Sequence, residues 1–254
     1  MPDFASDDHL SLDDPSGVRR ALVVAAHPDD VDFGAAGTVA QWVAAGVEVA
    51  YCVVTDGDAG GPDRSMPPAE VAKLRREEQR QAAAEVGVSR VDFLGYPDGK
   101  LALTLELRRD VTRVVRAWRP ERLVCQSPER NWERIGASHP DHLAAGEAAV
   151  CAAYPDARNP FAHPELLEEG LEPHCVKELW LMASPQPNRA VDITGNFAKK
   201  LAALRRHESQ VRHEADLEGR LRGWASAGAS LAGLPQGALA ELFQVVTMPP
   251  SGSS

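Results

Sequence analysis

Two short clusters of histidines and aspartates contain residue types that suit metal chemistry. The first is Ala26-His27-Pro28-Asp29-Asp30, and the second is Ser138-His139-Pro140-Asp141-His142. A catalytic zinc site uses three imidazole or carboxylate ligands and keeps a fourth position for water. Two imidazoles and one carboxylate from these clusters would complete such a set. The remaining acidic and imidazole groups would lie beside the water, where amide hydrolysis needs a proton acceptor and an oxyanion stabiliser.

Each cluster follows the carboxyl end of a predicted strand. Residues 20–26 are mostly small and apolar, which is typical of a strand that is covered on both faces. Residues 123–125 form another such strand, and a long loop leads from it to the second cluster. Ligands bind at the carboxyl ends of the strands in open α/β sheets. We therefore expect the two clusters to meet at one edge of the sheet.

Predicted strands and helices alternate along the chain. The other predicted strands cover 47–54, 91–94, 176–182 and 190–194, and the predicted helices cover 35–45, 68–86, 104–118, 139–153 and 197–210, with one or two helices beyond. This alternation favours an α/β fold of the Rossmann-like, doubly wound type, with a mainly parallel sheet and helices on both faces. We expect a disordered acidic tail over 1–17, a single domain over 18–248 and a flexible C-terminus over 249–254. The segments 55–67 and 154–173 are predicted to form the pocket walls.

Composition narrows the classes of partner. The 37 acidic residues outnumber the 27 basic ones, for a net charge of −10, and no basic stripe is present. Nucleic acid is therefore not an expected partner. No apolar run approaches the roughly 20 residues of a membrane span, and no export signal is evident. We expect no membrane association, a cytoplasmic protein and free thiols at its four dispersed cysteines.

Together the two clusters resemble the motifs of the LmbE-like (PIG-L-type) zinc-dependent N-deacetylases. Further marks of that family are Arg75-x-x-Glu78 with Gly87, Pro97-Asp98-Gly99, and the run from Lys200 through His207 to Gln210. The resemblance covers roughly residues 20–215. Two paired motifs at matching fold positions are far more specific than either motif alone.

The resemblance implies a metal site made of His27, Asp30 and His142. It implies one Zn²⁺ per chain, and Fe²⁺ or another divalent metal would suit the same donors. The family's first motif commonly continues with glutamate, where this chain has Val31, and some relatives have tyrosine where this chain has Ala137. Neither change removes a ligand, so we expect altered surroundings of the metal and retained chemistry.

The resemblance also implies roles for the residues around the metal. Asp29 would act as the general base, and His139, oriented by Asp141, would stabilise the oxyanion or protonate the leaving amine. Arg75 and Asp98 would reach substrate hydroxyls or shape the pocket.

The sequence thus predicts a zinc-dependent hydrolase that removes an N-acetyl or other N-acyl group from an amino-sugar-like small molecule. Because family members often self-associate, we also expect a homo-oligomer, with cover for the apolar residues Leu231, Leu234, Leu239 and Leu242. Two alternatives remain open. Two histidines and one carboxylate also form the facial triad of non-haem iron oxygenases, although such an enzyme has no use for Asp29. The chain could instead be an inactive relative that keeps its metal.

Overall fold

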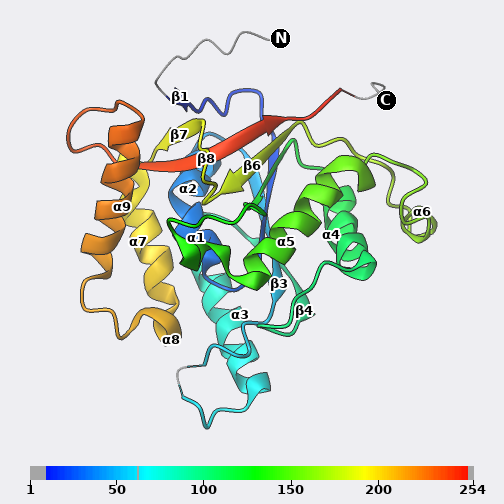
Figure 1. Ribbon diagram of the computed structural model, residues 1–254, viewed down its shortest axis with the longest axis horizontal. Helices are drawn as coiled ribbons and strands as arrows, with labels where there is room; N and C mark the ends of the chain where they lie inside the picture. The colour runs from blue at the N-terminus through cyan, green and yellow to red at the C-terminus, as the bar shows by residue number, and fades with distance from the viewer. Residues whose placement is uncertain (1–9, 62, 251–254) are drawn as a thin grey trace.

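The computed structural model describes residues 10–61 and 63–250 of the chain. The strands form one eight-stranded sheet in the order β1-β7-β8-β6-β5-β2-β3-β4. Its strands are β1 (Ser11–Leu12), β2 (Arg20–Ala25), β3 (Glu48–Thr55), β4 (Arg90–Tyr96), β5 (Arg122–Gln126), β6 (Glu178–Met182), β7 (Arg189–Asp192) and β8 (Ala240–Thr247). The long arrow of the last strand, β8, crosses the upper part of Figure 1. Every neighbouring pair is parallel except the two that involve β8. The predicted α/β fold with a mainly parallel sheet is confirmed.

The helices alternate with the strands over most of the chain. They are α1 (Asp30–Gly34), α2 (Ala36–Ala44), α3 (Pro68–Glu85), α4 (Leu105–Trp118), α5 (Pro140–Cys151), α6 (Glu165–Glu168), α7 (Phe197–Arg206), α8 (Glu208–Val211) and α9 (Leu217–Leu231), with shorter turns η1 (Ile135–Ser138), η2 (Ala152–Asp156) and η3 (Thr194–Asn196). Among the described residues, no helix has both the length and the apolar character that crossing a membrane requires.

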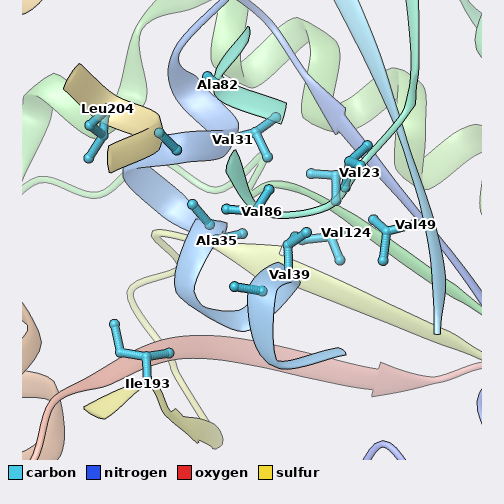
Figure 2. Packing of buried hydrophobic residues seen from close by; sticks show 14 of the residues in the cluster. Val23, Val31, Ala35, Val39, Val49, Ala82, Val86, Val124, Ile193 and Leu204 are labelled. Atoms are coloured by element: carbon cyan, nitrogen blue, oxygen red, sulfur yellow. The ribbon is translucent and has the colours of Figure 1, made fainter. Parts of the chain in front are cut away.

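The central strands are buried on both faces because their side chains alternate between two cores. Val23 and Ala25 of β2 face a cluster that includes residues of α2, α3 and α7, whereas Leu22 and Val24 face one that includes residues of α4 and α5. Figure 2 shows the first of these cores, to which β2, β3 and β5 contribute valines. This packing holds the carboxyl ends of the central strands in place, and both predicted clusters follow those ends.

The N-terminal segment corrects one expectation. The disordered tail was predicted over 1–17, but Ser11 and Leu12 pair with β7. The buried carboxylate of Asp13 then accepts a hydrogen bond from Trp42 Nε1 at 2.7 Å and pairs with Arg122 at 3.1 Å. The acidic composition of this segment favoured disorder. The partners that order it could not be predicted, because they are distant in the sequence. The part of the predicted tail over residues 1–9 lies outside the described residues.

The C-terminal segment also differs from what its sequence predicts. Only helices were predicted beyond residue 210, yet β8 follows α9 and inserts antiparallel between β6 and β7. Leu239 is consequently buried against the fold and needs no partner chain to cover it. Pro249, in the predicted flexible end, accepts a hydrogen bond from Arg158 through its carbonyl group. Residues 251–254 lie outside the described part of the chain.

The proline-rich segment 154–173 is largely irregular, as predicted, and α4 makes many of the hydrogen bonds that hold it. The buried guanidinium of Arg116 donates hydrogen bonds to the carbonyl groups of Asp156, Asn159 and Ala162. These bonds fasten the segment to α4. The structure therefore offers no support for a pocket wall made by this segment. The predicted thiols Cys52 and Cys125 are free and buried.

Candidate metal centre

The loop after β2 is fastened by hydrogen bonds at each end. Ala26 N–H donates to Gln126 Oε1 of the neighbouring strand at 2.9 Å, and His27 N–H donates to Asp30 Oδ2 at 2.7 Å. Asp30 is the first residue of α1. The loop therefore presents the imidazole of His27 and the carboxylate of Asp30 on one side, at the carboxyl edge of the sheet.

The second cluster begins α5. Pro140 is the first helical residue, and its fixed φ and missing N–H suit that position. Two residues later, His142 Nδ1 lies 3.2 Å from the carbonyl oxygen of Ala137, which leaves Nε2 to face the sheet edge. Gly146 allows α5 to approach β5, because a Cβ there would lie 2.3 Å from the carbonyl oxygen of Gln126. This close packing brings His142 to the first cluster.

The two clusters meet, as predicted. The carboxylate of Asp30 lies between two imidazoles, with Oδ2 at 3.2 Å from His27 Nδ1 and Oδ1 at 3.1 Å from His142 Nε2. Potential ligand atoms of His27, His139 and His142 all lie within 4.8 Å of one another. His27 and His142 thus belong, with His139, to a group that could hold a metal, and the predicted ligand Asp30 contacts both of them. Imidazole nitrogens and carboxylate oxygens are the donors that zinc prefers, so the chemistry of these residues fits a divalent metal.

The outer side of the His27 ring is also held. Its Nε2 lies 3.1 Å from Asp98 Oδ1 and 3.2 Å from Asp141 Oδ2. Asp141 is fully buried and accepts hydrogen bonds from the backbone N–H groups of Gly99 and Leu101. A carboxylate on the far ring nitrogen is the usual way in which a protein orients a histidine that binds metal.

This arrangement differs from the role predicted for Asp141, which was to orient His139. Its carboxylate contacts His27 and the Gly99 turn, whereas His139 receives only its backbone N–H, which donates to His139 Nδ1 at 3.2 Å. The reason is that His139 caps α5, so its ring folds over the first turn of the helix. His139 is exposed, and its ring centre lies 5.1 Å from that of His27.

Arg75 lies beneath the site rather than on its surface. It is only 4% exposed, so it is poorly placed to reach a substrate hydroxyl. Its guanidinium donates to the carbonyl groups of Pro28 at 2.6 Å and Gly57 at 3.0 Å, and to Asp29 Oδ2 at 3.2 Å. Arg75 thus holds Asp29, and Asp98 contacts His27, so both lie directly beside the two clusters.

The site contains strongly perturbed acids and bases. Burial raises the pKa of Asp29 to about 6, against the opposing charge of Arg75. Burial would also raise the pKa of Asp30, but His142 and His27 lower it well below its usual range. Burial lowers the pKa of His27, but its bonds to Asp30 and Asp98 outweigh burial and raise it to about 10. Perturbed groups of this kind cluster at functional sites.

Several residues behind the site were not found from the sequence. Gln79 accepts a hydrogen bond from the backbone of Asp29, and Asp32 links Gln79 to His207. In the sequence, His207 is distinguished only by its place in the family resemblance. Val31, where relatives commonly have glutamate, is fully buried with Ala82 and Leu204 (Figure 2). Its side chain thus belongs to the core beneath the loop and not to the pocket.

The fold and the site define a Rossmann-like α/β protein with a potential His/Asp metal centre at the carboxyl edge of its sheet. The family model described as "PIG-L: GlcNAc-PI de-N-acetylase" matches residues 22–153, more than half of the chain. The chain belongs to this family, also called LmbE-like. The match spans both clusters.

Two relatives are named deacetylases. The diacetylchitobiose deacetylase of Thermococcus kodakarensis is 34% identical over 197 residues, which cover 76% of this chain and 70% of the relative. The structure of the N,N'-diacetylchitobiose deacetylase from Pyrococcus horikoshii matches with a TM-score of 0.83 at 30% identity, covering 91% of this chain and 85% of the other.

A third comparison shows the fold alone. The structure of GalB, the 4-carboxy-2-hydroxymuconate hydratase from Pseudomonas putida KT2440, matches with a TM-score of 0.75 at 22% identity, covering 93% of this chain and 99% of the other. The same architecture thus carries a different named reaction, so the activity must be argued from the site.

Proposed function

We propose that this chain is a zinc-dependent N-deacetylase that hydrolyses the acetamido group of an N-acetylated amino sugar. The observation that carries the proposal is the position of the Asp30 carboxylate between His27 and His142, with Asp29 and His139 close by. The two deacetylases compared above are named for a disaccharide of N-acetylglucosamine, which supports this substrate class.

His27, Asp30 and His142 would hold the metal. When bound, zinc would polarise water and the amide carbonyl group. The rest of the reaction requires a base for the attacking water and an acid for the leaving nitrogen. Hydrolysis adds water across the amide, breaks its C–N bond and releases acetate and the free amine.

Asp29 is suited to accept the proton from the attacking water. Its pKa of about 6 keeps it ionised at neutral pH while leaving it basic enough to take a proton. Arg75 fixes one of its oxygens and prevents the carboxylate from turning away. His139 is exposed beside the metal ligands and can donate a proton to the leaving nitrogen or a hydrogen bond to the oxyanion.

The test is acetate release by the zinc-loaded protein from N,N'-diacetylchitobiose and N-acetylglucosamine. We expect stoichiometric acetate and primary amine, formed about 10²–10⁴-fold more slowly by the Asp29→Asn variant. The facial-triad oxygenase would instead consume O₂, and an inactive metal-binding relative would bind zinc and yield neither product. Either of those results, across a panel of N-acetylated amino sugars, would refute the proposal.

We also propose that the chain forms a homo-oligomer. Exposed apolar side chains surround a groove of about 1180 Å³ between the loop 129–134 and α9, and they include Trp132, Trp224 and Leu231. Large exposed apolar patches often mark association surfaces. Light scattering at micromolar concentration should give a multiple of 27.3 kDa. A purely monomeric mass would contradict this proposal.

A further inference from the structure

Asp29 has a backbone conformation that aspartate seldom adopts. Its φ of 101° and ψ of −28° lie in the left-handed region, where a side chain is normally disfavoured. Strained residues of this kind persist only when their surroundings hold them firmly, and they concentrate at functional sites. The contacts of this residue therefore identify what aims its carboxylate.

Two side chains of α3 clamp the peptide unit between Pro28 and Asp29. Arg75 donates to the carbonyl oxygen of Pro28 at 2.6 Å, and Gln79 Oε1 accepts from the N–H of Asp29 at 2.9 Å. Arg75 and Gln79 are four residues apart, so they project from the same face of the helix. Because both ends of one peptide plane are bound, its rotation about the chain is blocked.

The Gln79 amide must face one way for this clamp to work. Gln79 is fully buried, and its Nε2 donates to Asp32 Oδ2 at 2.8 Å. If the amide were reversed, its NH₂ group would oppose the N–H of Asp29 and its oxygen would oppose the Asp32 carboxylate. Asp32 therefore decides the direction of the amide.

A residue of the C-terminal half holds Asp32 in turn. The Nε2 atom of His207, which follows α7, lies 2.8 Å from Asp32 Oδ2, and both side chains are fully buried. Lys200 of α7 donates to the backbone carbonyl groups of Asp32 and Phe33 at 3.1 and 2.6 Å. The run from Lys200 to His207 thus supports the loop through α1.

We propose that Gln79 is a positioning residue that fixes the Pro28–Asp29 peptide and thereby aims the Asp29 carboxylate, with its own amide fixed by Asp32 and His207. The inference rests on the proposed role of Asp29 as general base. His27, Asp30 and His142 have separate contacts, so loss of Gln79 leaves the metal ligands in place. We therefore expect the loss of Gln79 to lower kcat and to leave zinc affinity unchanged.

The experiment compares Gln79→Leu with Gln81→Leu, the same change at an exposed position of the same helix. A displacement of about 1 Å at a reacting group costs about 10²-fold in rate, so we expect a fall of that order in kcat for Gln79→Leu alone. Its KM and zinc content should match those of the control. Hydrogen exchange of the Asp29 amide, followed by NMR, should become at least about tenfold faster because its acceptor is lost.

A kcat within twofold of the Gln81→Leu control, or an unchanged exchange rate at Asp29, would overturn the inference. If the unmodified protein releases no acetate, the proposed function fails. The exchange rates would then still measure whether Gln79 holds the Asp29 peptide.

A second pair of variants tests the same inference if Gln79→Leu does not fold. His207→Leu removes the donor to Asp32, whereas His207→Gln can replace Nε2 with an amide nitrogen. We expect kcat to fall about tenfold in the first and to recover in the second, as for other supporting residues of active sites. Equal kcat values in the two variants would show that His207 has only a structural part and would count against the inference.

Discussion

The two loops that supply the site are held in different ways. The metal loop, residues 26–34, is bound from outside by Gln79 and Arg75 of α3, by Gln126 of β5, and by Lys200 and His207. Up to His139 the second loop, residues 127–142, relies mainly on its own contacts, whereas the Asp141 carboxylate accepts hydrogen bonds from the backbone of Gly99 and Leu101. Ser138 Oγ accepts from the N–H of Asn131, and residues 132–136 are exposed.

This difference matches the chemistry proposed for each loop. A general base must be held at one angle to be efficient, and the metal loop carries that residue on strained backbone. A group that meets the leaving nitrogen must be reachable, and the second loop presents His139 to solvent. The fold therefore holds the proposed base, Asp29, rigidly and leaves the proposed acid, His139, accessible to solvent. Four experiments test this contrast between the two loops.

The largest effect is expected from His142, the proposed metal ligand on the second loop. His142→Ala should remove most bound zinc and all measurable hydrolysis, because only two ligands would remain. Metal content by mass spectrometry and acetate release would measure this. His213→Ala, at an exposed histidine, is the control. Full zinc content in His142→Ala would exclude His142 as a ligand.

Within the metal loop, two neighbouring aspartates should behave differently. Asp29→Asn should lower kcat by about 10²–10⁴-fold while zinc is retained, because a positioned base is lost. Asp30→Asn should weaken zinc binding, with activity partly restored by excess zinc. The assignment fails if Asp29→Asn loses its metal or turns over at a near-normal rate.

The pH dependence of kcat/KM tests the state of the base. A carboxylate can accept a proton only when ionised, so activity should fall as the pH drops through the pKa of Asp29, which is about 6 without metal. A bound cation acts like Arg75 and lowers this pKa, so the acid limb should lie at or below pH 6. On this acid limb kcat/KM should fall nearly tenfold per pH unit. An acid limb that lies above pH 7 would argue against Asp29 as the general base.

The smallest effect concerns stability. Burial lowers the pKa of His207, but its bond to Asp32 outweighs burial and raises it. The folded protein therefore binds this proton more tightly than the unfolded chain, which adds stability below pH 6.5 that is lost as the pH rises through the folded pKa. Glutamine in His207→Gln cannot titrate. The free energy of unfolding of this variant should be lower than that of the unmodified protein by about 0.5–3 kcal/mol. This difference should shrink between pH 6 and pH 9. Urea titrations of the metal-free proteins would measure it, and a constant deficit would contradict it.

Much of the site could be predicted from short stretches of sequence. His27 and Asp30 share one tight loop, and His142 begins a helix after another buried strand, so local spacing and strand burial were enough to bring them together. The same local signals predicted most strands and helices to within a few residues. They failed for Ser11–Leu12 and for β8, where pairing with distant strands decides the structure.

The proposed donor set could be predicted from two short motifs and their family resemblance, and the alternating α/β pattern and the sheet edge where these motifs lie could be predicted from neighbouring residues. How the proposed donors are supported depends on the packing of distant segments. Gln79 meets Asp29 across 50 positions of the chain, and His207 meets Asp32 across 175. Hydrogen bonds between such distant residues leave no periodic pattern in the sequence, since each depends on how whole helices pack. For the same reason Arg75, on a helix that looks solvated, is a buried partner of the proposed base.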